Sequence, residues 1–143
     1  MWSTTAVRIV GLDVGTVRTG IAVTDELGIT AQPVDVVKST VADVADIVRR
    51  LKAERVVAGL PLDMRGETGK QARRVLAFLD GLGEVLEIPI ETWDERFSTI
   101  LAERVLLEAD VRRSRRKQVR DKLSASIILQ SWLEAHPRSR EFP

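Results

Sequence analysis

The hydrophobic pattern of this chain changes period near residue 40, and this change limits the folds that the chain can adopt. Before it, three short apolar runs lie close together at residues 6–13, 19–24 and about 30–37, separated by turn-forming residues. Their length and spacing are typical of strands joined by hairpins. After it, segments with a repeat of three to four residues alternate with single short apolar runs, as helices alternate with strands. The sequence therefore predicts an α/β domain.

The later segments supply the helices and two more strands. Helices are predicted at about 41–51, 68–82, 98–109 and 117–135, and strands at 55–60 and 88–93. Thr40 and Asp43 are placed like a capping pair at the start of the first of these helices. Gly81 and Gly83 mark the expected end of the second, since glycine often follows the last helical residue.

The order strand–strand–strand–helix–strand–helix–strand–helix–helix predicts one mixed five-stranded sheet with helices on both faces, because the crossovers are right-handed. Residues 1–135 are expected to form this single domain, and residues 136–143 a disordered tail. Ligands of such sheets bind beyond the carboxyl ends of the parallel strands. Asp13 ends the first strand and Glu95 follows the fifth, so both are expected near that edge.

The composition excludes several classes of chemistry. The chain has no cysteine and a single histidine, His136. This excludes a disulfide scaffold, a thiolate zinc site, a cysteine nucleophile and a Ser-His-Asp triad. An enzyme of this composition must rely on carboxylates, to which metal-bound water is a candidate addition. No apolar run is long enough to cross a bilayer, and the first residues lack a signal-peptide pattern, so no membrane partner and a cytoplasmic location are expected.

Positive charge is concentrated in one segment. Residues 112–122 contain seven lysines and arginines and one acid, Asp121, in a chain whose net charge is +1. Cations hold phosphates and carboxylates hold Mg²⁺ or Mn²⁺, so this segment suggests a polyanion brought to an acidic metal centre. The alternative is a solvated basic loop.

Asp121 lies on an otherwise apolar helix face. At about 100° per residue it shares that face with Ala125, Ile128 and Trp132. Burial of an unpaired carboxylate costs several kcal/mol, so Asp121 needs a metal or a neighbouring arginine as a partner. The alternative is that Asp121 lies in the first helical turn, where the helix dipole favours an acid.

Asp13 and Glu95 each have an ordinary explanation as well. Asp13 lies between Gly11 and Gly15, which would let a phosphate or a metal approach the backbone, but simple turn chemistry explains the same pattern. Glu95 precedes a predicted helix, where an acid commonly complements the helix dipole. The predicted meeting of Asp13, Glu95 and Asp121 at one sheet edge weighs against three independent explanations.

A glycine-bearing loop follows the fourth predicted strand. Residues 64–71 resemble a phosphate-binding P-loop but lack its first glycine and the Ser/Thr after Lys70, so a nucleotide site is not expected. The loop lies at the same sheet edge and could still contact a nucleic-acid backbone.

Four segments of the chain resemble the YqgF/RuvX family of RNase H-like nucleases. They occur in family order and span nearly the whole chain: GLDVGTVRTGIAV at 11–23, VAGLPL at 57–62, WDERFST at 93–99 and DKLSASIILQSWL at 121–133. The resemblance implies an RNase H-like fold and places the family's acidic site on Asp13, Glu95 and Asp121. One departure is the loop LPLDMRG at 60–66, where the family often has LPLNMDG, so a substrate contact by Asp63 or Arg65 is an open question.

The resemblance implies an endonuclease of bacterial ribosome biogenesis that processes the 5′ end of the 16S rRNA precursor. The hypothesis is that Asp13, Glu95 and Asp121 hold one or two Mg²⁺ or Mn²⁺ ions, one activating a water and the other stabilising the leaving oxygen. RNA is favoured over DNA as the partner. Cationic side chains are expected to hold the flanking phosphates: Arg18, Arg112, Arg113, Arg115, Arg116 and Lys117.

Three alternatives remain at this point. The family is also described as Holliday-junction resolvases by likeness to RuvC, and a resolvase needs a dimer for two symmetric cuts. An actin-like ATPase shares the DVGT pattern at 13–16 but binds nucleotide between two such domains, and 143 residues supply one. A non-catalytic RNA-binding factor would bind RNA without metal. The sequence leaves open the cleavage position, the metal and the oligomeric state.

Overall fold

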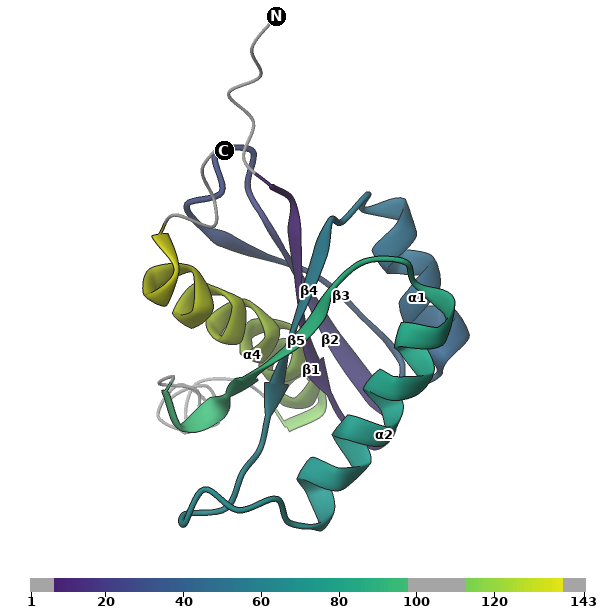
Figure 1. Cartoon of the computed structure of the whole chain (residues 1–143), viewed down its shortest axis with the longest axis vertical. Coiled ribbons are helices and arrows are strands. Elements are labelled where there is room, and N and C mark those ends of the chain that lie inside the picture. The colour runs from purple at the N-terminus through teal and green to yellow at the C-terminus, as the bar shows by residue number, and fades with distance from the viewer. Residues whose placement is uncertain (1–6, 98–112, 138–143) are drawn as a thin grey trace, which may run out of the picture.

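The protein folds around one mixed five-stranded sheet, as the sequence predicts (Figure 1). The computed structural model describes residues 7–97 and 113–137, with the side chains of 113–122 outside the described part. The strand order is β3-β2-β1-β4-β5. The strands are β1 (Ile9–Val14), β2 (Arg18–Thr24), β3 (Ala31–Lys38), β4 (Arg55–Leu60) and β5 (Ile90–Asp94).

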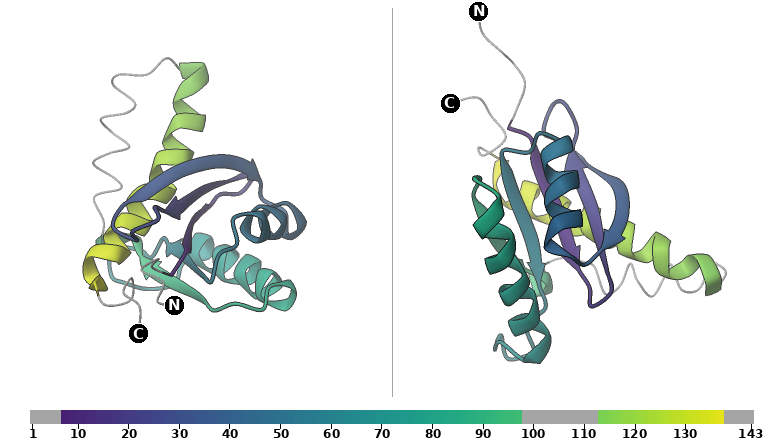
Figure 2. Two further views of the ribbon diagram at one scale, coloured as in Figure 1. Left: turned by 90° about the horizontal axis from the view of Figure 1, so that it is seen from above. Right: turned by 90° about the vertical axis from the view of Figure 1, so that its right-hand side faces the viewer.

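The strand directions follow from the connections. β1, β2 and β3 pair antiparallel through short turns, whereas β4 runs parallel to β1 and β5 parallel to β4. The helices α1 (Val41–Arg50) and α2 (Lys70–Val85) form the crossovers and lie on one face of the sheet. The long helix α4 (Arg113–Ala135) covers the other face (Figure 2). The carboxyl ends of β1, β4 and β5 therefore share one edge.

Alternation along the strands divides the core into two layers. Val10 and Leu12 of β1 belong to the cluster formed with α1 and α2, whereas Ile9 belongs to the cluster formed with α4. The α4 cluster contains Ala22, Val57 and five helix residues: Ala125, Ile128, Leu129, Trp132 and Leu133. The strand β1 therefore contributes side chains to both layers, because successive side chains of a strand point to opposite faces.

The predicted cap of α1 is confirmed. Thr40 Oγ1 accepts a hydrogen bond from the Asp43 backbone N–H at 3.1 Å and donates one to the Asp43 carboxylate at 2.9 Å. The predicted end of α2 at Gly81 and Gly83 is wrong, because the helix continues to Val85. A Cβ atom on Gly81 would lie 3.2 Å from Val41 Cγ2, so this glycine permits close packing of α1 on α2 instead of ending the helix.

Other boundaries also differ from the prediction or fall outside the described residues. The helix predicted at 98–109 lies outside them, and α4 begins at Arg113, earlier than the predicted 117. His136 was expected in a tail, yet its ring stacks on Trp132 at 4.3 Å and its Nδ1 donates to the Trp132 carbonyl at 2.8 Å. None of the helices in the described ranges is long and apolar enough to cross a membrane.

Candidate active site at the carboxyl edge of the sheet

Asp13 lies at the end of β1, on the face that α4 covers. Ile9 packs in the α4 cluster, and strand alternation places Gly11 and then Asp13 on the same face. Asp13 is half-buried and pairs in register with Gly20 of β2. The sequence-predicted position of this carboxylate at the sheet edge is therefore confirmed.

Glu95 reaches the same part of the edge from β5. The chain leaves β5 at Asp94 and enters a single 3-10 turn, η1 (Glu95–Phe97). Glu95 Cγ lies 3.1 Å from the point that a Cβ atom on Gly59 would occupy. Gly59 pairs with Trp93 of β5, and the preceding Ala58 pairs with Leu12 of β1. Continuation of that register by one residue places Gly59 beside Asp13, so the Glu95 side chain passes over the strand position next to Asp13.

Two glycines let α4 lie directly on this part of the sheet. A Cβ atom on Gly59 would lie 2.5 Å from Ile128 Cδ1, and one on Gly11 would lie 2.7 Å from Leu129 Cβ and 3.0 Å from the Ala125 carbonyl oxygen. A side chain at position 11 would therefore require α4 itself to move, whereas one at position 59 would first displace the end of the Ile128 side chain. Sequence reasoning noted Gly11 for ligand access, but its close contact is with α4.

Asp121 precedes Ala125 by about one turn of α4. The structure describes its backbone as part of α4, and its side chain lies outside the described part. Its role as the third acid stays a prediction.

A divalent cation suits the carboxylates of Asp13 and Glu95. Carboxylate oxygens are the ligands that Mg²⁺ and Mn²⁺ prefer, and the glycine at 59 keeps a Cβ atom out of the space beside Glu95. Within the described residues no group of three metal-ligating side chains occurs. Asp13 and Glu95 are thus two candidate ligands, and the side chain of the third candidate, Asp121, lies outside the described part.

Arg96 fixes the turn that carries Glu95. Its guanidinium donates to both carboxylate oxygens of Asp94, with Nη2–Oδ2 at 2.6 Å and Nε–Oδ1 at 3.1 Å, and its backbone N–H donates to Oδ1 at 2.9 Å. The hydrogen bonds from Arg96 hold the pKa of Asp94 below its ordinary value. Asp94 and Arg96 are the residues on either side of Glu95, so their hydrogen bonds hold the turn η1 that carries this candidate metal ligand.

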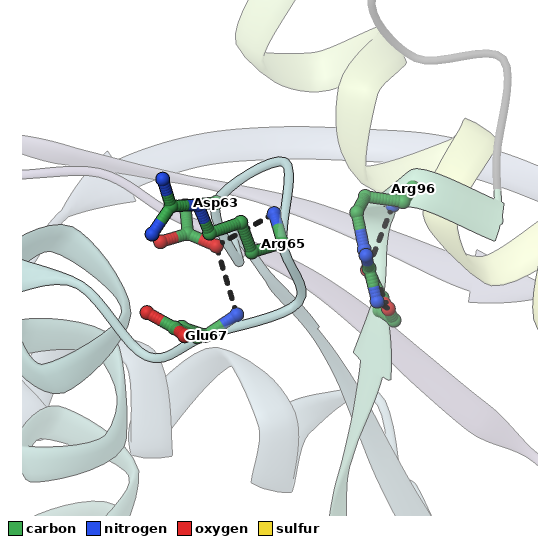
Figure 3. A network of polar contacts seen from close by, with 5 residues as sticks. Asp63, Arg65, Glu67 and Arg96 are labelled. Carbon is green, nitrogen blue, oxygen red and sulfur yellow. Dashed lines mark hydrogen bonds and ion pairs between the residues drawn. The ribbon is translucent and has the colours of Figure 1, made fainter.

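The loop after β4 is held by Asp63 and lies against Arg96 (Figure 3). Asp63 Oδ1 accepts hydrogen bonds from the backbone N–H groups of Arg65 at 2.9 Å and Glu67 at 2.8 Å. Gly66 has φ +80°, and a Cβ atom there would lie 2.9 Å from Arg96 Nη2. The acid at 63 thus has a structural role in the loop, which sequence reasoning missed because an Asx turn and a substrate contact use the same residue type.

Arg18 begins β2 at the same sheet edge, directly after the β1–β2 turn. The Gly15 N–H donates to the Arg18 carbonyl at 3.0 Å, and a Cβ atom on Gly15 would lie 2.4 Å from that oxygen, so the tight turn requires glycine. Arg18 is half-buried and pairs with Lys38 in the register of β2 and β3. The structure therefore brings one predicted phosphate-binding cation to the sheet edge.

Comparison with known proteins agrees with this geometry. A sequence model of the RuvX family, described as Holliday junction resolvase, matches residues 7–135. A protein of Desulforamulus reducens named "Putative pre-16S rRNA nuclease" is 43% identical over 133 residues, which cover 90% of this chain and 97% of the relative. One of the same name from Myxococcus xanthus is 46% identical over 134 residues, covering 90% and 89%. This chain belongs to the RuvX family.

The fold is that of RuvC-like, RNase H-fold resolvases. The structure of Thermus thermophilus RuvC in complex with a Holliday junction substrate superposes with a TM-score of 0.59 at 16% identity, covering 94% of this chain and 98% of RuvC. The fowlpox virus Holliday junction resolvase gives a TM-score of 0.52 at 14% identity, covering 90% and 99%. The family and the fold implied by the four sequence segments are thus confirmed.

For the basic segment of this RuvX-family chain, the structure describes the backbone from Arg113 onward but not the side chains. Arg112 lies outside the described residues. The backbones of Arg113, Arg115, Arg116 and Lys117 form the first turns of α4, and their side chains are outside the described part. Figure 2 shows these turns extending past the sheet. Phosphate binding by these five residues stays a prediction.

Proposed function

We propose that this protein is a metal-dependent endonuclease that processes the 5′ end of the 16S rRNA precursor in the cytoplasm. As a member of the RuvX family it is a hydrolase acting on phosphodiester bonds. The names of the relatives reported above support the 16S rRNA precursor as the substrate. The observation that carries the proposal is the Glu95 side chain lying over Gly59, beside the end of β1 that bears Asp13.

The residues of the edge have distinct tasks in the proposed reaction. Asp13 and Glu95, with Asp121 as the third candidate, would hold one or two Mg²⁺ or Mn²⁺ ions. A bound ion of this kind lowers the pKa of a water and stabilises the leaving oxygen, so no histidine base is needed. Arg96 and Asp94 keep Glu95 in position through η1. Arg18 and the basic segment at 112–117 would hold phosphates next to the scissile one.

A four-way DNA junction is the second candidate substrate. The description of the matching family and the RuvC-like fold favour it. Two symmetric cuts need two active sites, so junction resolution would require a dimer. A non-catalytic RNA-binding role is the third candidate, and it predicts binding that is independent of metal.

The test is a cleavage assay with purified protein in Mn²⁺, Mg²⁺ or EDTA. The substrates are single-stranded RNA that contains the precursor 5′ end and a four-way DNA junction. Asp13→Asn removes a candidate ligand while it keeps the shape of the side chain. Asp46→Asn is the matched control, because Asp46 pairs with Arg50 on the exposed surface of α1.

We expect metal-dependent cutting of the RNA that is lost in Asp13→Asn, retained in Asp46→Asn, and accompanied by unchanged RNA binding. Paired symmetric nicks in the junction would replace the RNA-processing proposal by junction resolution. Binding without cutting by the wild-type protein in every metal would leave the RNA-binding role. Parallel loss of binding and cutting in Asp13→Asn would contradict the assignment of Asp13 as a metal ligand.

A further inference from the structure

A second polar site lies on the opposite side of the end of β1 from Asp13. A pocket opens between the β1–β2 turn, the residue after β3 and the first turns of α2. Its polar lining consists of Thr16, Ser39, Gln71 and Arg74. Val14, the residue after Asp13, also lines it. Because neighbouring residues of a strand point to opposite faces, Asp13 and Val14 direct the two sites to opposite sides of one strand end.

The hydroxyl groups of the pocket are held by the turn. Ser39 Oγ donates to the Gly15 carbonyl at 2.7 Å and lies 2.8 Å from Thr19 Oγ1. The Ser39 backbone N–H donates to the Val17 carbonyl at 2.9 Å, so the β1–β2 turn is tied to the start of α1. The turn therefore presents Thr16 from a fixed backbone.

Arg74 closes the pocket from α2. Its Nη1 donates to Thr16 Oγ1, a contact between residues 58 positions apart in the chain. Arg74 is the single charged residue among those that line the pocket, and none of them is a carboxylate. A guanidinium beside hydroxyl and amide groups, without an acid, matches the oxygens of a phosphate.

We propose that this pocket binds a backbone phosphate of the nucleic-acid substrate, on the same strand as the phosphate cleaved at Asp13. The inference rests on the proposed nuclease function, which supplies the polyanion. Thr16 and Arg74 are both exposed, so a bound strand can reach them. A strand that crosses the β1–β2 turn contacts the Asp13 side with one phosphate and the Arg74 pocket with a neighbouring one. The pocket then sets the register of the strand at the catalytic carboxylates.

The adjacent residue Arg73 provides a matched control. It is also an exposed arginine of α2, but its Nη1 donates to the Thr68 carbonyl at 3.2 Å and it does not line the pocket. Arg74→Met and Arg73→Met remove the same charge from neighbouring positions. Thr16→Val is a second pocket variant that removes the hydroxyl and keeps the shape of the side chain.

The experiment measures binding of a fluorescent single-stranded RNA with the precursor end by anisotropy, in EDTA and over a range of salt concentrations. We expect Arg74→Met to weaken binding about tenfold at low salt, because a charged hydrogen bond to phosphate is lost. The slope of log K against log salt should fall by about 0.7. Thr16→Val should weaken binding in the same direction, and Arg73→Met should change neither quantity. Equal losses in Arg73→Met and Arg74→Met, or wild-type binding by Arg74→Met, would overturn the proposal.

A scan with methylphosphonate links locates the contact. Each RNA carries one uncharged link, and we expect one position where the replacement weakens binding to the wild-type protein but not to Arg74→Met, as in a double-mutant cycle. The same penalty in both proteins at every position would exclude a phosphate at the pocket. Inorganic phosphate and a mononucleotide serve as competitors. If either occupies the pocket while RNA binding stays unchanged, the ligand is a free phosphate compound and the backbone proposal is wrong.

Failure of this inference can be told from failure of the proposed function. Binding in EDTA does not depend on cleavage. If the wild-type protein cuts no substrate but Arg74→Met loses RNA binding, the pocket stands and the nuclease proposal falls. If the wild-type protein cuts RNA and Arg74→Met binds as well as wild type, the pocket proposal falls alone. Thermal unfolding of each variant shows that the losses do not come from an altered fold.

Discussion

Single residues at the carboxyl edge of the sheet control how closely its elements approach. Gly59 is the central example, because Ile128 and Glu95 both occupy the space that a side chain would need there. The candidate ligand Glu95 passes closely over β4, and a Cβ atom at residue 59 would lie only 3.1 Å from its Cγ. The packing of α4 and the position of the candidate ligand Glu95 thus both depend on this glycine.

We predict that Gly59→Ala lowers the free energy of unfolding by about 1–3 kcal/mol, the cost of overpacking a core. It should also reduce cleavage, because Glu95 has to shift by a few tenths of an ångström to admit the new Cβ atom. Urea unfolding and the RNA cleavage assay measure the two effects. Gly83→Ala is the control. Gly83 lies inside α2, and a Cβ atom there would meet only Ile90 Cδ1 of β5, at 3.9 Å. It should raise stability by up to about 1 kcal/mol, and equal effects of the two substitutions would contradict the packing explanation.

At the scale of elements, η1 and the loop after β4 meet through the guanidinium of Arg96. The side chain of Asp94 is only 12% exposed, and it holds Arg96 against Gly66 of the loop. Asp63 in turn shapes the loop from within by accepting two backbone hydrogen bonds. These contacts connect two segments that follow neighbouring parallel strands.

The Asp94–Arg96 contact should make stability depend on pH in one direction. The pKa of Asp94 lies below its ordinary value in the folded protein, chiefly because of the hydrogen bonds from Arg96. A lowered pKa contributes stability that is present above about pH 4 and is lost as the pH falls through the folded-state value. Asp94→Asn should therefore cost about 1 kcal/mol at pH 7, as for a partly exposed pair, and progressively less in acid. Urea unfolding at pH 7 and pH 2.5 tests this, and a cost that is independent of pH would contradict it.

The Asp63 turn predicts a difference between two substitutions at one position. Asp63→Asn keeps an oxygen that accepts from the N–H groups of Arg65 and Glu67, whereas Asp63→Ala removes it. We expect amide hydrogen exchange at Arg65 and Glu67 to increase about tenfold in Asp63→Ala, for a lost hydrogen bond of about 1.4 kcal/mol, and to stay unchanged in Asp63→Asn. If Asp63→Asn also loses protection, the charge and not the acceptor geometry holds the loop.

For the whole molecule, α4 and the sheet together form the second core layer. Trp132 is fully buried in that layer, its Nε1 donates to Glu91 Oε2 at 3.1 Å, and His136 stacks on its ring. The two layers share the strands of one sheet, so neither can lose its packing without exposing the residues between them. The protein should unfold as a single cooperative unit.

We predict that Trp132→Ala costs about 3–5 kcal/mol, as for the removal of a buried aromatic side chain. Urea unfolding followed by far-ultraviolet circular dichroism and by tryptophan fluorescence should give one shared midpoint in the wild-type protein and in the variant. Separate midpoints for the two signals would show that the α4 layer unfolds independently.

The sequence by itself determined the α/β class, the hairpin and crossover order, and the positions of Asp13 and Glu95 at one edge. Hydrophobic period and chain order are local properties, and they are enough to place strand ends relative to one another. Four segments resembling the family also predicted the RuvX assignment, which the comparisons confirm. The roles of Asp121 and of the basic segment stay predictions.

The tertiary structure alone decided how segments far apart in the chain meet. Gly81 lies inside α2 with Val41 packed close to it, Glu95 and Ile128 lie over Gly59, and Arg74 meets Thr16 across a pocket. Each of these depends on the distance between two packed elements. No periodic pattern within either element encodes that distance, because it is fixed by the volumes of the side chains that lie between them.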